Sequence, residues 1–324
     1  MARIVLHIGA HKTATTTVQN TLAANSRLLA KHRILYPRIH PGNAHHALAT
    51  SWIDLPERYC NPAPPADLWR EVIRHADDEV TVILSSEEFS RGRPKAVNFA
   101  ELRSILDAFS ERLVVCTLRN QLAYLQSIYL QVARDLPQLD FEAFLGGALR
   151  DRYATGVFLD YGALYDHVLA GFAPEEIRFL SYEAACRHEG GILGALLAEI
   201  GFPSADLVPL AADSNVSPEP LVAWAANQIT RPQAPGGALT ASAQAAFAET
   251  FGKAARSTLY SRAEAGRIAT YFMPLNAAFE ARYRKIDPDF ALAPLTLAPN
   301  LVYRGQLTTP FWSRFCKRIY ARTA

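Results

Sequence analysis

One stretch near the start of the chain, from Ile4 to Leu22, constrains the fold more than any other. Its first residues, Ile4 to Ile8, are mostly apolar and β-branched, which is typical of a strand buried on both faces. Gly9 follows at once and permits a sharp turn. The stretch therefore predicts a buried strand that ends in a tight loop, and the loop opens directly into a helix.

The loop after this strand carries the side chains of an anion site. Lys12 supplies a positive charge, and Thr13, Thr15 and Thr16 supply hydroxyl groups. A helix N-terminus exposes unpaired N–H groups and the positive end of the helix dipole. We therefore expect the junction of loop and helix to bind an anion, most simply a phosphate.

The length of the loop narrows the kind of phosphate ligand. A Walker A motif places four residues between its first glycine and the Gly-Lys-Ser/Thr that follows, whereas only Ala10 and His11 separate Gly9 from Lys12. A nucleotide kinase would also need an aspartate at a strand end to hold magnesium, and none is apparent. A P-loop-type small-molecule kinase is thus the weaker alternative.

The shortened loop resembles the 5′-phosphosulfate loop of sulfotransferases that use 3′-phosphoadenosine 5′-phosphosulfate (PAPS), in which a strand leads through G-x-x-K-T-G-T-T into a helix. Ala14 stands where the family pattern usually has glycine. The resemblance implies a P-loop-NTPase-like α/β fold and sulfuryl transfer from PAPS, which leaves PAP. It makes Lys12 a catalytic residue as well as a ligand. It assigns donor binding to Gly9, His11, Lys12, Thr13, Ala14, Thr15 and Thr16.

A second strand and helix extend the resemblance. Glu111 to Leu118 is typical of another buried strand, and it delivers Arg119 to the edge where open α/β sheets bind ligands. Apolar residues then recur at intervals of three and four, which predicts an amphipathic helix containing Ser127. By resemblance to the sulfotransferases, Arg119 and Ser127 bind the 3′-phosphate of PAPS. Without that context, an arginine followed by a serine is more often structural.

A third strand, Val80 to Leu84, brings two acidic residues to the same edge, because it is expected to lie beside the first strand. Glu87 and Glu88 follow it. By resemblance to the carbohydrate sulfotransferases, one of them is the general base that removes the acceptor proton, and Glu87 is preferred. The alternative is an ordinary solvated pair of glutamates.

Histidines offer a rival base. His45 and His46 lie in a loop that contains proline and glycine, and the usual pKa of histidine suits proton transfer near neutral pH. The alternative for each is a loop histidine hydrogen-bonded to the backbone. For His11, contact with the sulfate and packing within the loop are equal alternatives. No pair of His or Cys residues has the spacing of zinc ligands, so we expect no metal site.

Strand and helix patterns alternate to about residue 200, which predicts a mainly parallel sheet with helices on both faces. We expect a PAPS-binding α/β core over residues 1–210, and a loop insertion near residues 37–66 is a candidate wall of the acceptor site. Helical patterns predominate afterwards and predict a helical C-terminal extension, residues 211–324, packed on the core. Its last residues interleave aromatic and cationic side chains, which suits either peripheral membrane contact or, more commonly, a terminal helix docked on the protein itself.

Composition bounds the function classes. Half of the 324 residues are hydrophobic, which excludes a disordered chain, and a net charge of +2 does not indicate nucleic-acid binding. Four scattered cysteines are typical of free thiols, and no signal peptide or long apolar run is apparent, so we expect a cytoplasmic protein. The resemblance implies sulfation of a hydroxyl or amine, on a saccharide or glycoconjugate. The alternative from another class is a catalytically silent PAP-binding module.

Overall fold

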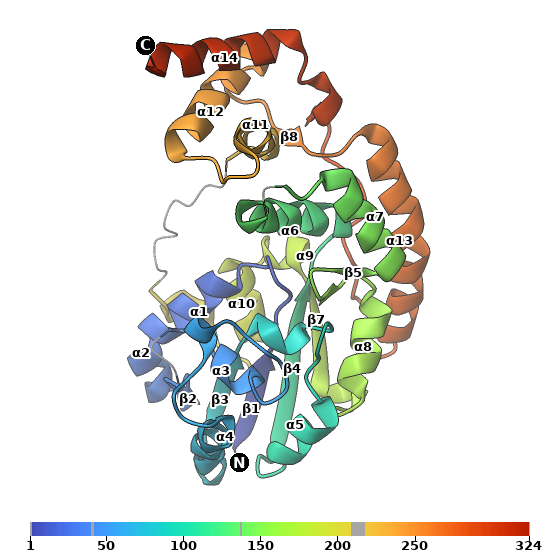
Figure 1. Cartoon of the computed structure of the whole chain (residues 1–324). Helices are drawn as coiled ribbons and strands as arrows, with labels where there is room; N and C mark the ends of the chain where they lie inside the picture. The colour runs from blue at the N-terminus through green and yellow to red at the C-terminus, as the bar shows by residue number, and fades with distance from the viewer. Residues whose placement is uncertain (1, 40–41, 137, 209–217, 324) are drawn as a thin grey trace. The chain divides into compact units, whose positions relative to one another are not determined.

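The computed structural model describes residues 2–39, 42–136, 138–208 and 218–323 (Figure 1). Its centre is a sheet of five parallel strands in the order β2-β3-β1-β4-β7. Helices lie on both sides of these strands. The expected α/β fold, a parallel sheet flanked by helices with a helical C-terminal portion, is confirmed. The strands are β1 (Arg3–His7), β2 (Ile34–Leu35), β3 (Thr81–Ser85), β4 (Glu111–Leu118) and β7 (Ile177–Ser181).

The central strands form because the side chains that they direct to both faces of the sheet are mostly apolar. Val5, Ile83 and Val115 point to one face, where they share a core with α1 (Thr15–Ala24), α2 (Ser26–Lys31) and α10 (Gly191–Ala198). The alternate residues Ile4, Leu6, Val82, Leu84 and Val114 are just as fully buried. Burial on both faces is what a continuous apolar run specifies in a parallel sheet.

The strand register places the functional segments at one edge. β1 pairs with β3 from Arg3↔Thr81 to His7↔Ser85, and with β4 from Arg3↔Glu111 to His7↔Val115. The segments that leave the carboxyl ends of β1 and β3 are therefore neighbours, as predicted. The strand order also reverses around β1, and open α/β sheets bind ligands at such a switch point.

The remaining elements of the first part of the chain are short. Within the expected insertion lie α3 (His46–Ala49), a single turn η1 (Glu57–Tyr59) and the start of α4 (Pro65–Ile73). The others are η2 (Arg74–Asp77), η3 (Glu87–Ser90), α5 (Phe99–Ile105), β6 (Val157–Phe158), α8 (Tyr161–Leu169), η4 (Pro174–Glu176), α9 (Tyr182–Ala185) and η5 (Ser204–Asp206).

The chain folds as two compact units, and they do not follow the expected division between residues 210 and 211. Residues 1–120, 155–214 and 275–293 form the first unit, which holds the large sheet. Residues 121–154, 215–274 and 294–324 form the second unit. The expected boundary itself falls in residues 209–217, outside the described part of the chain.

Aromatic packing explains the division. In the second unit, Tyr129 of α6 (Gln121–Asp135) packs against Phe141 of α7 (Phe141–Asp151), and Phe141 contacts Tyr260. In the first unit, Phe279 packs against Phe179 of β7. Residues 121–154 therefore pack with segments that follow residue 218, and residues 275–293 pack with the sheet that precedes it. The change from alternating strands and helices to helices alone near residue 210 does not mark this division. The other elements of the second unit are β5 (Tyr153–Ala154), α11 (Pro220–Thr230), α12 (Gly237–Phe251), β8 (Ser257–Thr258), β9 (Val302–Tyr303), η6 (Arg304–Gln306) and α14 (Thr309–Thr323), and α13 (Arg262–Tyr283) runs through both units.

The C-terminal helix α14 docks within its own unit. Phe311 and Phe315 are fully buried, and Arg314 and Arg318 both pair with Glu249 of α12. The apolar face and two of the cations are therefore already used inside the protein, which favours the docked alternative over membrane contact. Within the described residues, no helix combines the length and apolar character needed to cross a membrane.

Candidate active site

The phosphate loop, residues 9–14, joins β1 to α1 through an unusual backbone. Gly9, Lys12 and Ala14 have φ values of 43°, 64° and 60°, in the left-handed region. A Cβ on Gly9 would lie 2.5 Å from Cγ2 of Thr15, so only glycine fits there. At Lys12 and Ala14 the left-handed conformation costs about 1–2 kcal/mol each. Strain of this kind persists where surrounding contacts impose it, and it is frequent at ligand sites.

Three carbonyl groups of the loop are each held by a protein donor. The Cys116 thiol donates to the Gly9 carbonyl at 3.2 Å, and the Thr13 hydroxyl donates to the Ala10 carbonyl at 2.6 Å. Arg119 donates from Nη1 to the Lys12 carbonyl at 2.7 Å. The negative ends of these peptide dipoles are therefore directed at the protein rather than at a bound anion.

The helix that follows the loop is suited to an anion. α1 has no acidic residue in its first turn, and Ala14 at its N-cap makes no side-chain capping hydrogen bond. Thr15 is buried, whereas Thr16 is exposed. Because the positive end of the helix dipole is neither capped by residue 14 nor neutralised in the first turn, it favours a negatively charged ligand.

Arg119 links the loop to a cavity. Its guanidinium lies 4.6 Å from the ring centre of Tyr182, and among the described residues its buried Nε has no hydrogen-bond partner. Tyr182 lines a cavity of about 370 Å³ beside the loop. The cavity lining also includes Ala14, Thr17, Val18, Cys186, Ile192 and Leu207. A guanidinium and an aromatic ring thus meet next to the candidate phosphate site.

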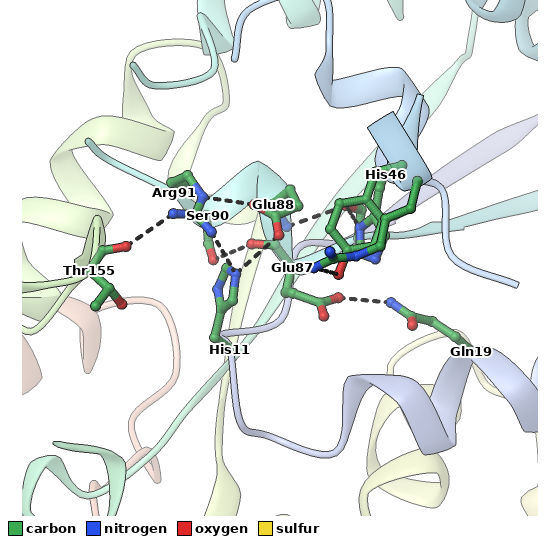
Figure 2. A network of polar contacts seen from close by, with 11 residues as sticks. His11, Gln19, His46, Glu87, Glu88, Ser90, Arg91 and Thr155 are labelled. Atoms are coloured by element: carbon green, nitrogen blue, oxygen red, sulfur yellow. Dashed lines mark hydrogen bonds and ion pairs between the residues drawn. The ribbon is translucent and has the colours of Figure 1, made fainter. Parts of the chain in front are cut away.

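The acidic turn, residues 86–91, follows β3 and directs its two glutamates to different partners (Figure 2). Ser86 caps the turn η3 by accepting a hydrogen bond from the Glu88 amide at 3.3 Å. Glu87 accepts from Nε2 of Gln19 at 2.9 Å. Glu88 lies 3.3 Å from Nε2 of His11 and accepts from Nε of Arg91 at 2.7 Å. The phosphate loop and the acidic turn are therefore joined through His11.

Both glutamates are held in the ionised state. Burial raises the pKa of Glu88, but the hydrogen bonds and charges of His11 and Arg91 outweigh it and lower the pKa to about 2. Burial likewise raises the pKa of Glu87, and the neighbouring His46 and His11, with the Gln19 hydrogen bond, bring it below its usual value. Glu88 is committed to an ion pair with Arg91, whereas Glu87 has a neutral amide partner. The geometry thus favours Glu87 as the proton acceptor.

The two adjacent histidines differ sharply. Nδ1 of His45 accepts from the Ser85 amide at 2.9 Å, so the ring proton is on Nε2, which lies 2.7 Å from the Pro37 carbonyl. Burial lowers the pKa of His45 to about 4. Backbone groups therefore occupy both ring nitrogens of His45. This arrangement fits the alternative of a loop histidine that is hydrogen-bonded to the backbone. His46 is only partly buried and has Nδ1 2.8 Å from the Ser86 hydroxyl, so it remains the rival base.

Three residues beside the site are not among those predicted from the sequence: Arg91, Cys116 and His7. His7 is fully buried with Nδ1 2.8 Å from the Ser85 hydroxyl, and burial lowers its pKa to about 4. Its Nε2 lies 3.6 Å from the position that a Cβ of Gly9 would take, directly beside the loop. The register of β4 beside β1 brings Cys116 to the loop, and the turn after β3 brings Arg91 within 3.4 Å of His11, so no sequence pattern singles out either residue. His7 precedes Gly9 by two residues and could have been identified as the polar residue in the apolar run from Ile4 to Ile8.

The structure brings Lys12, His11, Glu87, Glu88 and Arg119 to one region of the first unit. Ser127 lies on α6 in the second unit, and its role at the 3′-phosphate remains a prediction. Among the described residues, no group of three His, Cys, Asp or Glu side chains is arranged to hold a metal ion. All four cysteines are free thiols.

Comparison with known proteins adds similarity to solved structures. No family model matches the chain, and no curated protein sequence is similar to it. Among solved structures, the crystal structure of a sulfotransferase from Alicyclobacillus acidocaldarius is similar over 86% of this chain and 95% of that chain, with a TM-score of 0.49. The two sequences are 17% identical, which is too distant to carry a function from one protein to the other.

Proposed function

We propose that this protein is a sulfotransferase that moves the sulfuryl group of PAPS to a hydroxyl or amine of an acceptor, with a saccharide or glycoconjugate as the acceptor class. The observation that carries the proposal is the phosphate loop. It is too short for a Walker A motif, its carbonyls are held by Cys116, Thr13 and Arg119, and it opens into a helix without a side-chain cap. Such a loop suits the 5′-phosphosulfate end of PAPS.

The donor site is built from the loop outward. Lys12, the amides of residues 13–16 and the hydroxyls of Thr15 and Thr16 would hold the 5′-phosphosulfate, and His11 lies beside them in the loop. The cavity of about 370 Å³ next to Tyr182 offers space for a nucleoside. Arg119, with its unpartnered Nε among the described residues, and Ser127 are the candidate ligands of the 3′-phosphate.

The acceptor site is assigned to a second cavity of the first unit. This cavity, about 470 Å³, is lined by Asn20, Tyr36, Arg38 and Asn43, among others. Tyr36 donates to the Asn43 carbonyl at 2.6 Å, and Asn43 donates to Asn20 of α1 at 2.9 Å. Asn20, which lines the cavity, follows Gln19 of α1, and Gln19 donates to Glu87 at 2.9 Å, so Glu87 and the cavity lie near the same part of α1. Amide and hydroxyl groups are suitable partners for a polyhydroxylated acceptor.

In this mechanism, the acceptor oxygen or nitrogen attacks the sulfur atom while Glu87 accepts its proton. The bond between sulfur and the bridging phosphate oxygen breaks, and PAP leaves. Lys12 and the positive end of the α1 dipole stabilise the charge that develops on the departing phosphate oxygen. Holding donor and acceptor at adjacent sites supplies the orientation that in-line transfer needs.

A direct test is transfer from radiolabelled PAPS to a panel of neutral oligosaccharides, uronate-containing oligosaccharides and amino sugars. The proposal predicts labelled product with at least one acceptor class, and about 10²- to 10⁴-fold slower labelling with the Glu87→Gln variant. PAP binding without transfer to any acceptor would favour a silent PAP-binding module. Magnesium-dependent turnover of ATP would instead favour a kinase.

A further inference from the structure

Cys116 is the least obvious of the three donors that hold the phosphate loop. The register of β4 explains how it reaches the loop. The Ile8 amide still donates to the Val115 carbonyl at 2.9 Å, so β1 follows β4 up to that point. The chain then turns at Gly9, and the next residue of β4, Cys116, places its thiol 3.2 Å from the Gly9 carbonyl.

The Cys116 thiol is suited to act as a donor without ionising. Its side chain is fully buried, and burial raises the pKa of the thiol, so the proton stays on sulfur at neutral pH. A thiol is also a small and nearly apolar group, which can be buried beneath a loop at little cost when it donates only one weak hydrogen bond. A buried Cys of this kind does not need redox chemistry to have a role.

Planarity of the peptide bond carries the effect to the ligand side. The Gly9 carbonyl and the Ala10 N–H belong to one planar group and point in opposite directions. A donor that fixes the carbonyl therefore fixes the amide as well. Gly9 has φ 43° and no Cβ, so its own conformational preferences restrain this peptide less than those of any other residue would.

We propose that Cys116 is a positioning residue of the donor site: its thiol holds the Gly9 carbonyl so that the Ala10 N–H stays directed at the 5′-phosphosulfate. This role rests on the proposed function, in which the loop binds that group. Thr13 and Arg119 act in the same way on the next carbonyls, those of Ala10 and Lys12. Cys116 differs from them because it has no ligand contact of its own in the proposed mechanism.

The experiment compares PAP binding and sulfuryl transfer in Cys116→Val, Cys116→Ala and Cys116→Ser. Valine fills the site without a donor, and serine restores one. Thr117→Val is the matched control, because Thr117 is the next residue of β4, is fully buried, and has a hydroxyl with no hydrogen-bond partner among the described residues. If Cys116→Val folds poorly, the comparison rests on Cys116→Ser and Cys116→Ala, whose side chains differ by one oxygen atom.

The proposal predicts about five- to tenfold weaker PAP binding in Cys116→Val and Cys116→Ala, the usual effect of one lost hydrogen bond. Cys116→Ser should remain within about twofold of the wild type, and Thr117→Val should be unchanged. The carbon-13 shift of the Gly9 carbonyl should move in the Val variant and be largely restored by Ser. Equal PAP binding by all four variants, or equal weakening in Ser and Ala, would overturn the positioning role. A wild-type protein that binds no PAP would overturn the proposed function, and this inference with it.

Discussion

The phosphate loop and the acidic turn leave adjacent strands at the same edge of the sheet, but different interactions hold them. In the loop, side-chain donors fix the backbone through the carbonyls of Gly9, Ala10 and Lys12. In the turn, charges fix the side chains, since Glu88 is paired with Arg91 and lies beside His11. One segment presents an ordered backbone, and the other presents ordered carboxylates.

This difference separates two kinds of response to change. The loop should be sensitive to groups that set peptide orientation and insensitive to modest changes of pH. The turn should be sensitive to ionisation and tolerant of changes that keep its hydrogen bonds.

The largest effect is expected at Glu87. Glu87→Gln keeps the size of the side chain and a partner for Gln19 but removes the proton acceptor, so turnover should fall by about 10²- to 10⁴-fold while PAP binding is kept. The acidic limb of the pH–rate profile should also disappear from the residual activity. Steady-state kinetics across pH test this. If Glu87→Gln stays active and His46→Asn does not, His46 is the base.

Lys12→Ala should have the next largest effect, because it removes a charge from the departing phosphate oxygen. Turnover should fall by about 10²- to 10³-fold, the usual result of losing one such donor. The thermal unfolding temperature serves as the control and should stay close to that of the wild type. Near-normal turnover would remove Lys12 from the mechanism.

Glu88 should affect stability rather than chemistry. Since its pKa is lowered from its usual value near 4.5 to about 2, its ionised form stabilises the folded protein above pH 4.5 by up to about 3 kcal/mol. That contribution is lost as the pH falls from about 4.5 through about 2. Urea unfolding should therefore find Glu88→Gln less stable than the wild type at pH 7, with a difference that shrinks over this range. A constant difference would refute the assigned ion pair.

Arg119 tests whether one side chain serves both the loop and the ligand. Arg119→Ala should weaken PAP by about tenfold or more through the lost phosphate contact. Adenosine 5′-phosphate, which lacks the 3′-phosphate, should also bind more weakly, but by less, because the Lys12 carbonyl loses its donor. Calorimetric titration of both ligands measures the ratio. Equally weakened binding of both ligands would show that Arg119 supports the loop and does not contact the 3′-phosphate.

Ala14 gives the smallest effect, and one of opposite sign. At φ 60°, Ala14→Gly should stabilise the protein by up to about 1 kcal/mol, since glycine adopts this conformation without strain. Ala278→Gly is the matched control within α13, where the same change should destabilise by about 1 kcal/mol. Chemical denaturation of both variants tests the pair. A destabilised Ala14→Gly would show that the left-handed conformation carries no strain.

Much of the fold is predictable because apolar runs specify buried strands. The segment 111–118 is predicted with the bounds of β4, and β3 begins and ends one residue later than expected. The two units are not predictable in this way. They depend on contacts such as that of Phe141 with Tyr260, between residues far apart in the sequence.

The candidate site divides along the same line. Lys12 and Arg119 belong to recognisable motifs, and in the structure Nη1 of Arg119 donates to the Lys12 carbonyl at 2.7 Å. Cys116 reaches Gly9 only because β4 lies in one particular register beside β1. His45 also could not be resolved from sequence, because its role depends on the backbone groups of Ser85 and Pro37 that occupy its ring nitrogens.

If the short phosphate loop binds the nucleotide of PAPS, calorimetric titration of the wild-type protein with PAP, and with ATP in the presence of magnesium, will separate the two ligands. PAP should bind with micromolar or better affinity without magnesium, ATP should bind much more weakly, and Lys12→Ala should weaken PAP binding. Tighter binding of magnesium–ATP than of PAP, or no binding of PAP at all, would contradict this role of the loop.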